Sequence, residues 1–327
     1  MSRLLIRLCG VALAVAVVMR PICGVQAQNY PDRPVKIIVP SGPAGGYDFV
    51  GRVVADQLTK EFGAKFIVEN HAGAGTLLGT QFAAAAAPDG YTLVVGGLSN
   101  MVFNASIYAK PGYDPAKDFV PVALAYTLPY VLVARKDLPQ SSLKEIVAYA
   151  KANPGKMLLA NGGTGSGQHI MASAFKQMTG ITMVDVPYKA AQAVYPDLLS
   201  GRVDMFFDPL PTARGHLMSG QVKAIAMISP RRSRLFPQVP TSAEEGFPKL
   251  EIESWIGLFA PAKTPAPVLQ ALRTKLREGL NAPELKKRLE AGGGDVMHLS
   301  QDETDKMVRE EYARWTKLIR DAGIHAN

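Results

Sequence analysis

The stretch VKIIVPSGPAGGYDFVGRVVADQLTKEF, residues 35–62, decides the fold class. Residues 35–39 form an apolar run typical of a buried strand, and over 49–62 apolar residues recur at helical spacing. Between them lies the glycine-rich segment SGPAGGYD, residues 41–48. A strand, a turn and a helix in this order predict one unit of a parallel α/β sheet. The turn is either a plain tight connection or a loop that brings backbone N–H groups close to a negatively charged ligand.

The strand–turn–helix order recurs along the chain. Strands are predicted at 35–39, 65–70, 91–97, 157–161, 182–188, 202–208, 222–229 and 253–265, and at the start of 130–139. Helices are predicted at 49–62, 76–87, 141–156, 169–179, 191–199, 212–219, 265–281, 283–291 and 300–322. Capping boxes, Ser142 with Glu145 and Ser300 with Glu303, support two of the helix starts. The short connections predict parallel sheets with right-handed crossovers.

Two α/β lobes explain this order. The section 130–250 has the elements of a second sheet, whereas the last three helices bring no new strand and are expected to pack back on the first lobe. We therefore predict a first lobe from residues 28–128 plus 253–327 and a second lobe from 129–252. The chain then crosses between the lobes twice, as in a clamshell.

Residues 1–27 have the layout of a secretory signal peptide. Arg3 and Arg7 precede the apolar run 10–18, and small residues permit cleavage near Ala27. The apolar run is too short to span a bilayer. A lipid-anchored Cys23 is the alternative, although the residues before it lack the expected small-residue context.

Composition excludes several function classes. Cys9 and Cys23 are the only cysteines and precede the cleavage point, so the exported chain has no disulfide and no thiolate chemistry. The 300 residues that remain of 327 suffice for one large or two ordinary domains. Loss of the leader's three arginines lowers the net charge from +8 to +5, which favours anions. The chain lacks the dense basic stripe of a nucleic-acid-binding protein.

Loops follow six predicted strands, at 41–48, 71–75, 96–100, 162–169, 187–192 and 208–212, and glycine, serine, threonine and asparagine recur among them. In open α/β sheets, ligands bind beyond the carboxyl ends of the strands. Backbone N–H groups, hydroxyls and helix N-termini at this edge favour an anion. Any one of these loops is explained by the needs of a turn. Six of them in two lobes predict a cleft that binds a small carboxylate from both sides.

The candidate ligand-binding residues all lie in these loops. They are Gly45, Gly46, Tyr47, Asp48, Ser99, Asn100, Gly165, Ser166, Gln168, His169, Tyr188 and Asp208. Several have an alternative structural role. Asp48 caps the following helix or accepts a hydrogen bond from the ligand, and Tyr47 walls the cleft or packs against a neighbouring strand. His169 bonds locally or donates to the ligand, and Asp208 orients loop amides, takes a ligand proton or caps the helix from residue 212.

Residue types suited to catalysis are present without a catalytic pattern. Ser166, His169 and Asp208 are the types of a hydrolytic triad, but no serine lies in a G-x-S-x-G elbow. The five histidines show no paired metal-ligand spacing, and GAGTLLG at 73–79 is one residue too long for a dinucleotide fingerprint. We expect no enzymatic activity, no metal and no cofactor, with an exported hydrolase as the alternative.

Longer motifs point to a known family. They are YPDRPVKIIVP at 30–40, VENHAGAGTLLG at 68–79, YDPAKDFVPV at 113–122 and SWIGLFAPAKTP at 254–265, with the shorter segments PAGGYD, APDGYTL, VPYK and SGRVDMFFD. In combination they resemble the Bug family, the TctC-like solute receptors of tripartite tricarboxylate transporters. The resemblance extends from about Tyr30 to the C-terminus.

The resemblance implies a two-lobed periplasmic binding protein fold of type II that closes on a small molecule. It implies carboxylate ligands (di- and tricarboxylates, acidic amino acids or aromatic acids) and, as partners, the large and small membrane subunits of the transporter. A receptor that signals to a sensor kinase is the alternative role. Three departures from the family motifs concern the ligand: Ala44 replaces a loop glycine, Gly167-Gln168 replaces a Ser-Ser pair, and Pro209 removes an amide side chain.

Overall fold

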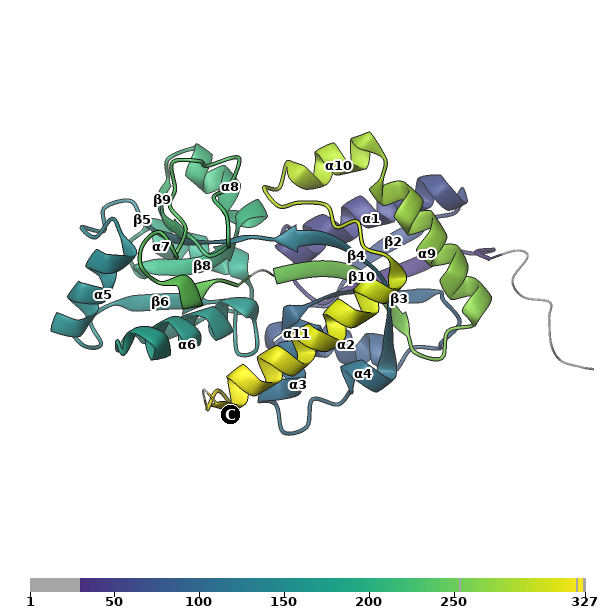
Figure 1. Ribbon diagram of the computed structural model, residues 1–327, viewed down its shortest axis with the longest axis horizontal. Coiled ribbons are helices and arrows are strands. Elements are labelled where there is room, and N and C mark those ends of the chain that lie inside the picture. Colours follow the sequence, from purple (N-terminus) through teal and green to yellow (C-terminus); the bar gives the residue numbers. More distant parts are fainter. Residues whose placement is uncertain (1–29, 253, 322, 326–327) are drawn as a thin grey trace, which may run out of the picture. The chain divides into compact units, whose positions relative to one another are not determined.

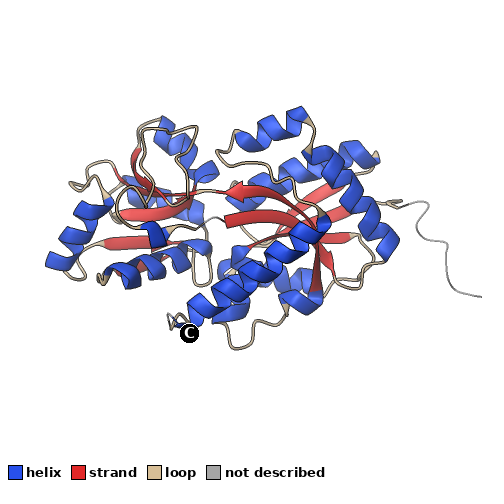
Figure 2. Ribbon diagram, viewed as in Figure 1, coloured by secondary structure: helices blue, strands red, loops and turns tan. Residues whose placement is uncertain are grey.

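The computed structural model describes residues 30–252, 254–321 and 323–325. The predicted signal peptide and both cysteines lie outside the described residues. Within them, the strands form two five-stranded mixed sheets, each flanked by helices (Figures 1 and 2). No helix in these ranges combines the length and the hydropathy that crossing a membrane requires.

The first sheet has the strand order β2-β1-β3-β10-β4. Its strands are β1 (Val35–Val39), β2 (Phe66–Asn70), β3 (Thr92–Gly97), β4 (Phe119–Leu128) and β10 (Ser254–Pro261). Strands β1, β2 and β3 are parallel, whereas β10 runs antiparallel to both β3 and β4. We call this sheet and its helices the first lobe.

The second sheet repeats this plan with the order β7-β6-β8-β5-β9. Its strands are β5 (Tyr130–Arg135), β6 (Leu158–Asn161), β7 (Val184–Pro187), β8 (Met205–Pro209) and β9 (Val222–Met227). Strands β6, β7 and β8 are parallel, and β5 runs antiparallel to β8 and β9. We call this sheet and its helices the second lobe.

Helices accompany the sheets of both lobes. Those of the first lobe are α1 (Gly46–Phe62), α2 (Leu77–Ala84), α3 (Asn104–Ile107), α4 (Pro115–Asp118), α9 (Ala266–Leu280), α10 (Pro283–Glu290) and α11 (Gln301–Asp321), with the 3₁₀ turn η1 (Ala74–Thr76) and the π-helical turn η2 (Ser99–Phe103). Those of the second lobe are α5 (Leu143–Ala152), α6 (Gly167–Thr179), α7 (Tyr195–Leu199) and α8 (Leu210–Met218), with the 3₁₀ turns η3 (Ala191–Val194) and η4 (Pro248–Leu250).

The predicted return of the last helices to the first lobe is confirmed. Helices α9 and α10 pack against α1, and α11 packs against α3, η2 and β4 (Figure 1). The two-lobed α/β class is confirmed as well. The division of the chain at residues 128/129 and 252/253 stays a prediction.

The predicted parallel arrangement is found for β1, β2 and β3 and for β6, β7 and β8, but not for β5 and β10. Strand β5 follows β4 after Pro129 alone, so no crossover helix precedes it and it enters its sheet in the opposite direction. Strand β10 is likewise antiparallel to its neighbours. Strand β4 was not predicted, because Pro121 interrupts an alanine-containing run that matches neither period clearly. Helix α1 also begins at Gly46, three residues before the predicted start at 49.

Aromatic side chains fill the centre of the first lobe. Trp255 and Phe259 stack on β10 with ring centroids 6.0 Å apart, and Trp255 has no solvent exposure. Because β10 is the fourth strand of a five-stranded sheet and is bonded on both edges, loss of this side chain leaves a cavity that neighbours cannot fill without moving the sheet.

We expect Trp255→Ala to lower the free energy of unfolding by about 3–5 kcal/mol, the range for large aromatic truncations. Chemical denaturation followed by circular dichroism measures this. Met218→Ala is the control, since Met218 at the end of α8 is 67% exposed, and it should stay within about 0.5 kcal/mol of the wild type. Equal costs for the two variants would contradict this packing.

Candidate functional site

Parts of all six predicted loops line one cavity of about 70 Å³. Three loops follow the parallel strands of the first lobe, and three follow those of the second. The lining residues are Pro40, Ser41, Gly42, Gly45, Gly46, Tyr47, Ala72, Gly73, Gly75, Thr76, Ser99, Tyr130, Gly162, Ser166, Gln168, Lys189, Ala190, Ala191, Gln192, Pro209 and Thr212. The cavity therefore lies where strand topology places ligands in α/β proteins.

Three helix N-termini meet at this cavity. The first turns of α1, α6 and α8 contribute Gly46, Gln168 and Thr212. The first N–H groups of a helix have no intrahelical acceptor, and the helix dipole adds partial positive charge there. Gly45 at the start of α1 has no side chain to cap these donors. At α8 the N–H of Leu210 already donates to the carbonyl of Pro129 and Pro211 has no N–H, so the main-chain donors for an anion come chiefly from α1 in the first lobe and α6 in the second.

Asp48 organises the first loop and does not face the cavity. Its side chain accepts hydrogen bonds from Ala44 N at 2.8 Å, Arg52 Nε at 2.9 Å and Asn70 Nδ2 at 2.9 Å. Burial alone would raise the pKa of Asp48, but these bonds outweigh it and hold the pKa below its ordinary value. Because both oxygens are engaged, Asp48 fixes the backbone of loop 41–48 around the cavity.

Glycines allow the loops of the two lobes to touch. A Cβ added to Gly75 would lie 2.0 Å from the carbonyl oxygen of Thr164, and one added to Gly165 would lie 2.4 Å from Asn104 Oδ1. Both glycines have positive φ, +58° and +83°. The first-lobe Ser99 Oγ accepts a hydrogen bond from the second-lobe Gly167 N at 3.0 Å. The lobes thus meet through backbone and small side chains.

The wall of the cavity contains one cation and no carboxylate. Lys189 is the only charged residue among those that line it. Two tyrosines add phenol groups, and burial raises the pKa of Tyr47 to about 12 and that of Tyr130 well above its ordinary value. Both phenols therefore remain protonated at neutral pH and able to donate. A ligand here meets donors and no negative charge.

The predicted site residues divide into two groups. Those that line the cavity are Gly45, Gly46, Tyr47, Ser99, Ser166 and Gln168; those that do not are Asp48, Asn100, Gly165, His169, Tyr188 and Asp208. The members of the second group have structural partners. Asn100 bonds to Thr80 and the backbone of β3, and Tyr188 donates to Asp197 at 2.7 Å.

The geometry of a hydrolytic triad is absent from the described residues 166, 169 and 208. Ser166 Oγ accepts from the backbone N of His169 at 3.2 Å, as a helix cap, and the imidazole Nδ1 accepts from Gly165 N at 3.4 Å. Asp208 accepts from Tyr195 Oη. Burial lowers the pKa of His169, so the ring stays neutral near pH 7. Among the described residues no group of three His, Cys, Asp or Glu side chains can hold a metal ion.

Several lining residues lie in predicted loops but were not singled out. Lys189, Gln192 and Thr212 belong to the second-lobe loops. Their position directly after strands β7 and β8 is the feature of the sequence that could have identified them as site residues. Tyr130 was missed altogether, because it begins strand β5 directly after a crossing and carries no loop pattern.

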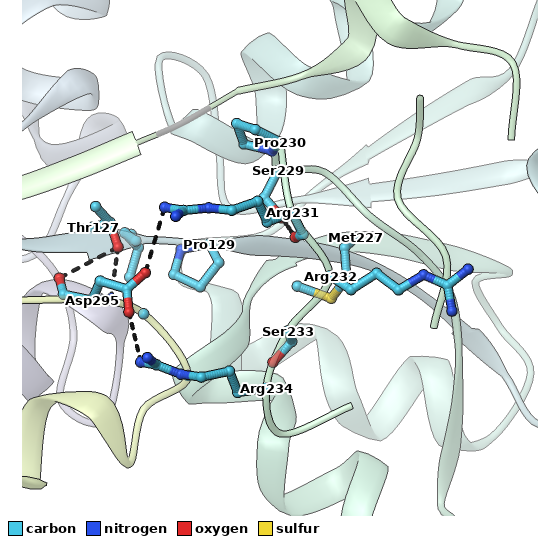
Figure 3. Close-up of a pocket in the computed structure, with 13 residues that line it drawn as sticks. Thr127, Pro129, Met227, Ser229, Pro230, Arg231, Arg232, Ser233, Arg234 and Asp295 are labelled. Atoms are coloured by element: carbon cyan, nitrogen blue, oxygen red, sulfur yellow. Dashed lines mark hydrogen bonds and ion pairs between the residues drawn. The ribbon is translucent and has the colours of Figure 1, made fainter. Parts of the chain in front are cut away.

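A larger cavity of about 480 Å³ lies beside the crossing from β4 to β5 (Figure 3). Its wall carries Arg231, Arg232 and Arg234. Figure 3 shows Arg231 and Arg234 reaching Asp295 from two sides. Their ion pairs with Asp295 measure 3.7 Å and 2.6 Å, and Arg232 pairs with Glu244 at 2.8 Å. Each guanidinium already has a carboxylate partner, so this cavity offers an anion little uncompensated charge.

Comparison with known proteins identifies a matching family and similar solved structures. Residues 50–324 match the family model TctC, described as the tripartite tricarboxylate transporter family receptor. The protein BugT of Bordetella pertussis strain Tohama I is 33% identical over 324 residues, which cover 99% of this chain and 98% of BugT.

Solved structures with the same architecture include two acid complexes. Rpa4515 of R. palustris with adipate has a TM-score of 0.86 and 31% identity, and the match covers 91% of this chain and 99% of that one. MatC of Rhodopseudomonas palustris with bound malate has a TM-score of 0.84 and 31% identity, covering 89% of this chain and 100% of that one. The periplasmic binding protein BugD has a TM-score of 0.86 and 33% identity, covering 91% of this chain and 100% of that one, and confirms the predicted periplasmic binding protein fold.

Ala44→Gly should stabilise the protein by up to about 1 kcal/mol. Ala44 is exposed and has φ +61°, a backbone conformation that costs a residue other than glycine about 1–2 kcal/mol. Glycine removes this strain, but its greater freedom in the unfolded chain offsets about 0.4–1 kcal/mol of the stabilisation. The free energy of unfolding from denaturant titration measures this. The control Ala148→Gly, exposed within helix α5, should instead destabilise by about 1 kcal/mol. A loss of stability in both variants would contradict the strain at Ala44.

Asp208→Asn should change how stability depends on pH. Burial raises the pKa of Asp208 well above its ordinary value, and the hydrogen bond from Tyr195 offsets this only in part. A carboxyl whose pKa is raised in the folded protein stabilises the fold fully below pH 3.8, the pKa of the unfolded group. This stabilisation is lost as the pH rises towards the pKa in the folded protein. The free energy of unfolding of the variant, relative to the wild type, should therefore increase from pH 4 upwards.

Denaturant titrations between pH 4 and pH 8 test this slope. Asp137→Asn is the control, because Arg135 lowers the pKa of that exposed carboxyl and its titration falls below this window. Its stability difference from the wild type should stay constant. A constant difference for Asp208→Asn as well would rule out a raised pKa at Asp208.

Proposed function

The chain belongs to the TctC family, the receptors of tripartite tricarboxylate transporters, and from this premise we propose that its cavity binds a compact organic acid. The resemblance to the Bug family is thereby confirmed. Members of this family are binding proteins and not enzymes, so the chain is a solute-binding receptor without catalytic activity.

The observation that carries the proposal is the charge of the cavity wall. It contains Lys189 and no carboxylate, and three helix N-termini converge on it. Hydrogen bonds from such donors to a charged acceptor contribute about 1.5–3 kcal/mol each. Two related structures hold adipate and malate, both carboxylic acids, which agrees with an anionic ligand here.

The same wall disfavours ligands with an ammonium group. A buried ammonium needs a carboxylate or several acceptors, and this wall offers carbonyls and hydroxyls only. Acidic amino acids are therefore the less favoured of the predicted ligand classes.

The size of the cavity favours short acids. A volume of about 70 Å³ holds roughly five to seven water-sized groups at about 10–15 Å³ each. An aliphatic acid of about four carbons fits this space better than an aromatic acid or a long diacid. Among the ligand classes implied by the family, we therefore favour short di- or hydroxycarboxylates.

We further propose the cellular role that the family membership suggests. The predicted leader at residues 1–27 directs the chain to the periplasm, where it delivers its acid to the large and small membrane subunits of a tripartite transporter. Lobes divided at residues 128/129 and 252/253 carry out the closing motion. Nothing in the described residues favours the signalling alternative.

L-Malate and L-aspartate form a matched pair of probes, since they differ by a hydroxyl and an ammonium group. We expect malate to raise the melting temperature and to bind at least about tenfold more tightly than aspartate in calorimetry, because the unpaired ammonium costs more than 1.4 kcal/mol. Adipate and nicotinate should bind more weakly than malate. Glucose serves as the uncharged control.

Two outcomes would count against the proposal. If no acid of the panel raised the melting temperature, the cavity would not be an acid-binding site. If aspartate or nicotinate bound as tightly as malate, the charge and size of the wall would not select the ligand.

A further inference from the structure

Two side chains of the second lobe have buried polar atoms without a partner at this cavity. Gln192 Nε2 and Thr212 Oγ1 are buried and form no hydrogen bond to any described residue. Both residues line the cavity. A buried amide or hydroxyl without a partner costs about 1–3 kcal/mol, and more than nine in ten such groups in proteins are paired. A ligand that supplies an acceptor removes this cost.

Gln192 lies directly over the first-lobe loop. A Cβ added to Gly45 would be 3.2 Å from Gln192 Nε2, and one added to Gly42 would be 3.8 Å from Gln192 Oε1. The amide therefore faces the glycines that precede helix α1, the place where main-chain donors are available for an acid.

We propose that Gln192 is a ligand-binding and specificity-determining residue, which donates from Nε2 to an acceptor oxygen of the bound acid. The proposal rests on the proposed function. Because Gln192 comes from η3 in the second lobe and the N-terminal donors of α1 come from the first, one acid satisfies both only when the lobes are together. Gln192 therefore couples ligand binding to closure.

The uncharged amide of Gln192 also affects which acids the cavity binds. Lys189 is exposed and attracts anions of any shape, whereas the amide of Gln192 requires an acceptor at one position. Replacing the amide by a carboxylate places negative charge against the ligand. Glutamate at this position should thus repel acids more strongly than leucine, which only removes the donor.

Calorimetric titration of L-malate and succinate into Gln192→Leu, Gln192→Glu and the wild type tests the proposal. We expect about tenfold weaker binding for Gln192→Leu and about hundredfold weaker binding for Gln192→Glu. Thr212→Val, which removes the second unpaired group, should weaken binding as well. Gln270→Leu, on the exposed face of α9, is the matched control and should bind as the wild type does.

The melting temperature without ligand separates a binding role from a structural one. Because Gln192 Nε2 has no hydrogen-bond partner among the described residues, Gln192→Leu should leave that temperature unchanged or raise it. A lowered melting temperature with unchanged affinity would overturn the proposal, as would affinities of both Gln192 variants within twofold of the wild type. If the wild type binds neither malate, succinate nor any other acid, the proposed function fails and this inference fails with it.

Discussion

The structure depends on the close approach of two sets of loops, which only backbone and very small side chains permit. At Gly75 the first lobe comes so near to the Thr164 carbonyl that a single added carbon would overlap it, at 2.0 Å. At Gly165 the second lobe makes the reciprocal approach to Asn104. A bulkier residue at either position would hold the lobes apart. The loops of both lobes line one cavity because these contacts are possible.

The same constraint explains the chemistry of the site. Where the loops of the two lobes touch, there is little room for large side chains. Many of the donors that face a ligand are therefore backbone N–H groups at helix N-termini, and these favour anions whatever the sequence of the loop. Asp48 does not line the cavity, but it stabilises the first loop by accepting hydrogen bonds from Ala44, Arg52 and Asn70. Selectivity must then come from the few side chains that do reach the cavity. Gln192, Thr212 and the two buried tyrosines are among those side chains, together with Lys189 and Gln168.

The sequence predicted most of the fold and the location of the candidate site. Strand and helix periodicity placed most elements within a few residues, and the segments after the parallel strands, four of them glycine-rich, marked the six loops. It did not predict strand direction at the crossings, because β5 and β10 owe their direction to the path of the chain between lobes and not to local pattern.

Individual site residues were harder to predict than loops. Asp48 and Asp208 have the residue type of a ligand acceptor, yet both are engaged by protein groups, a fact that depends on Arg52, Asn70 and Tyr195 arriving from other elements. Gln192 shows the opposite case. Nothing in its local sequence distinguishes it. Its importance follows from its position against the first-lobe glycines Gly42 and Gly45, where its Nε2 has no hydrogen-bond partner among the described residues. Such relations are set by tertiary packing.

A disulfide between the lobes tests the central claim, closure of the two loop sets over a bound acid, most directly. A Cβ at Gly42 would lie 3.6 Å from Ala190 Cβ, within the range of about 3.5–4.5 Å for a disulfide, and a chain starting at residue 28 has no other cysteine. Gly42→Cys with Ala190→Cys, loaded with malate and oxidised, should retain the acid through dialysis and release it on reduction. Oxidised protein that exchanged malate as fast as reduced protein would contradict closure at this site.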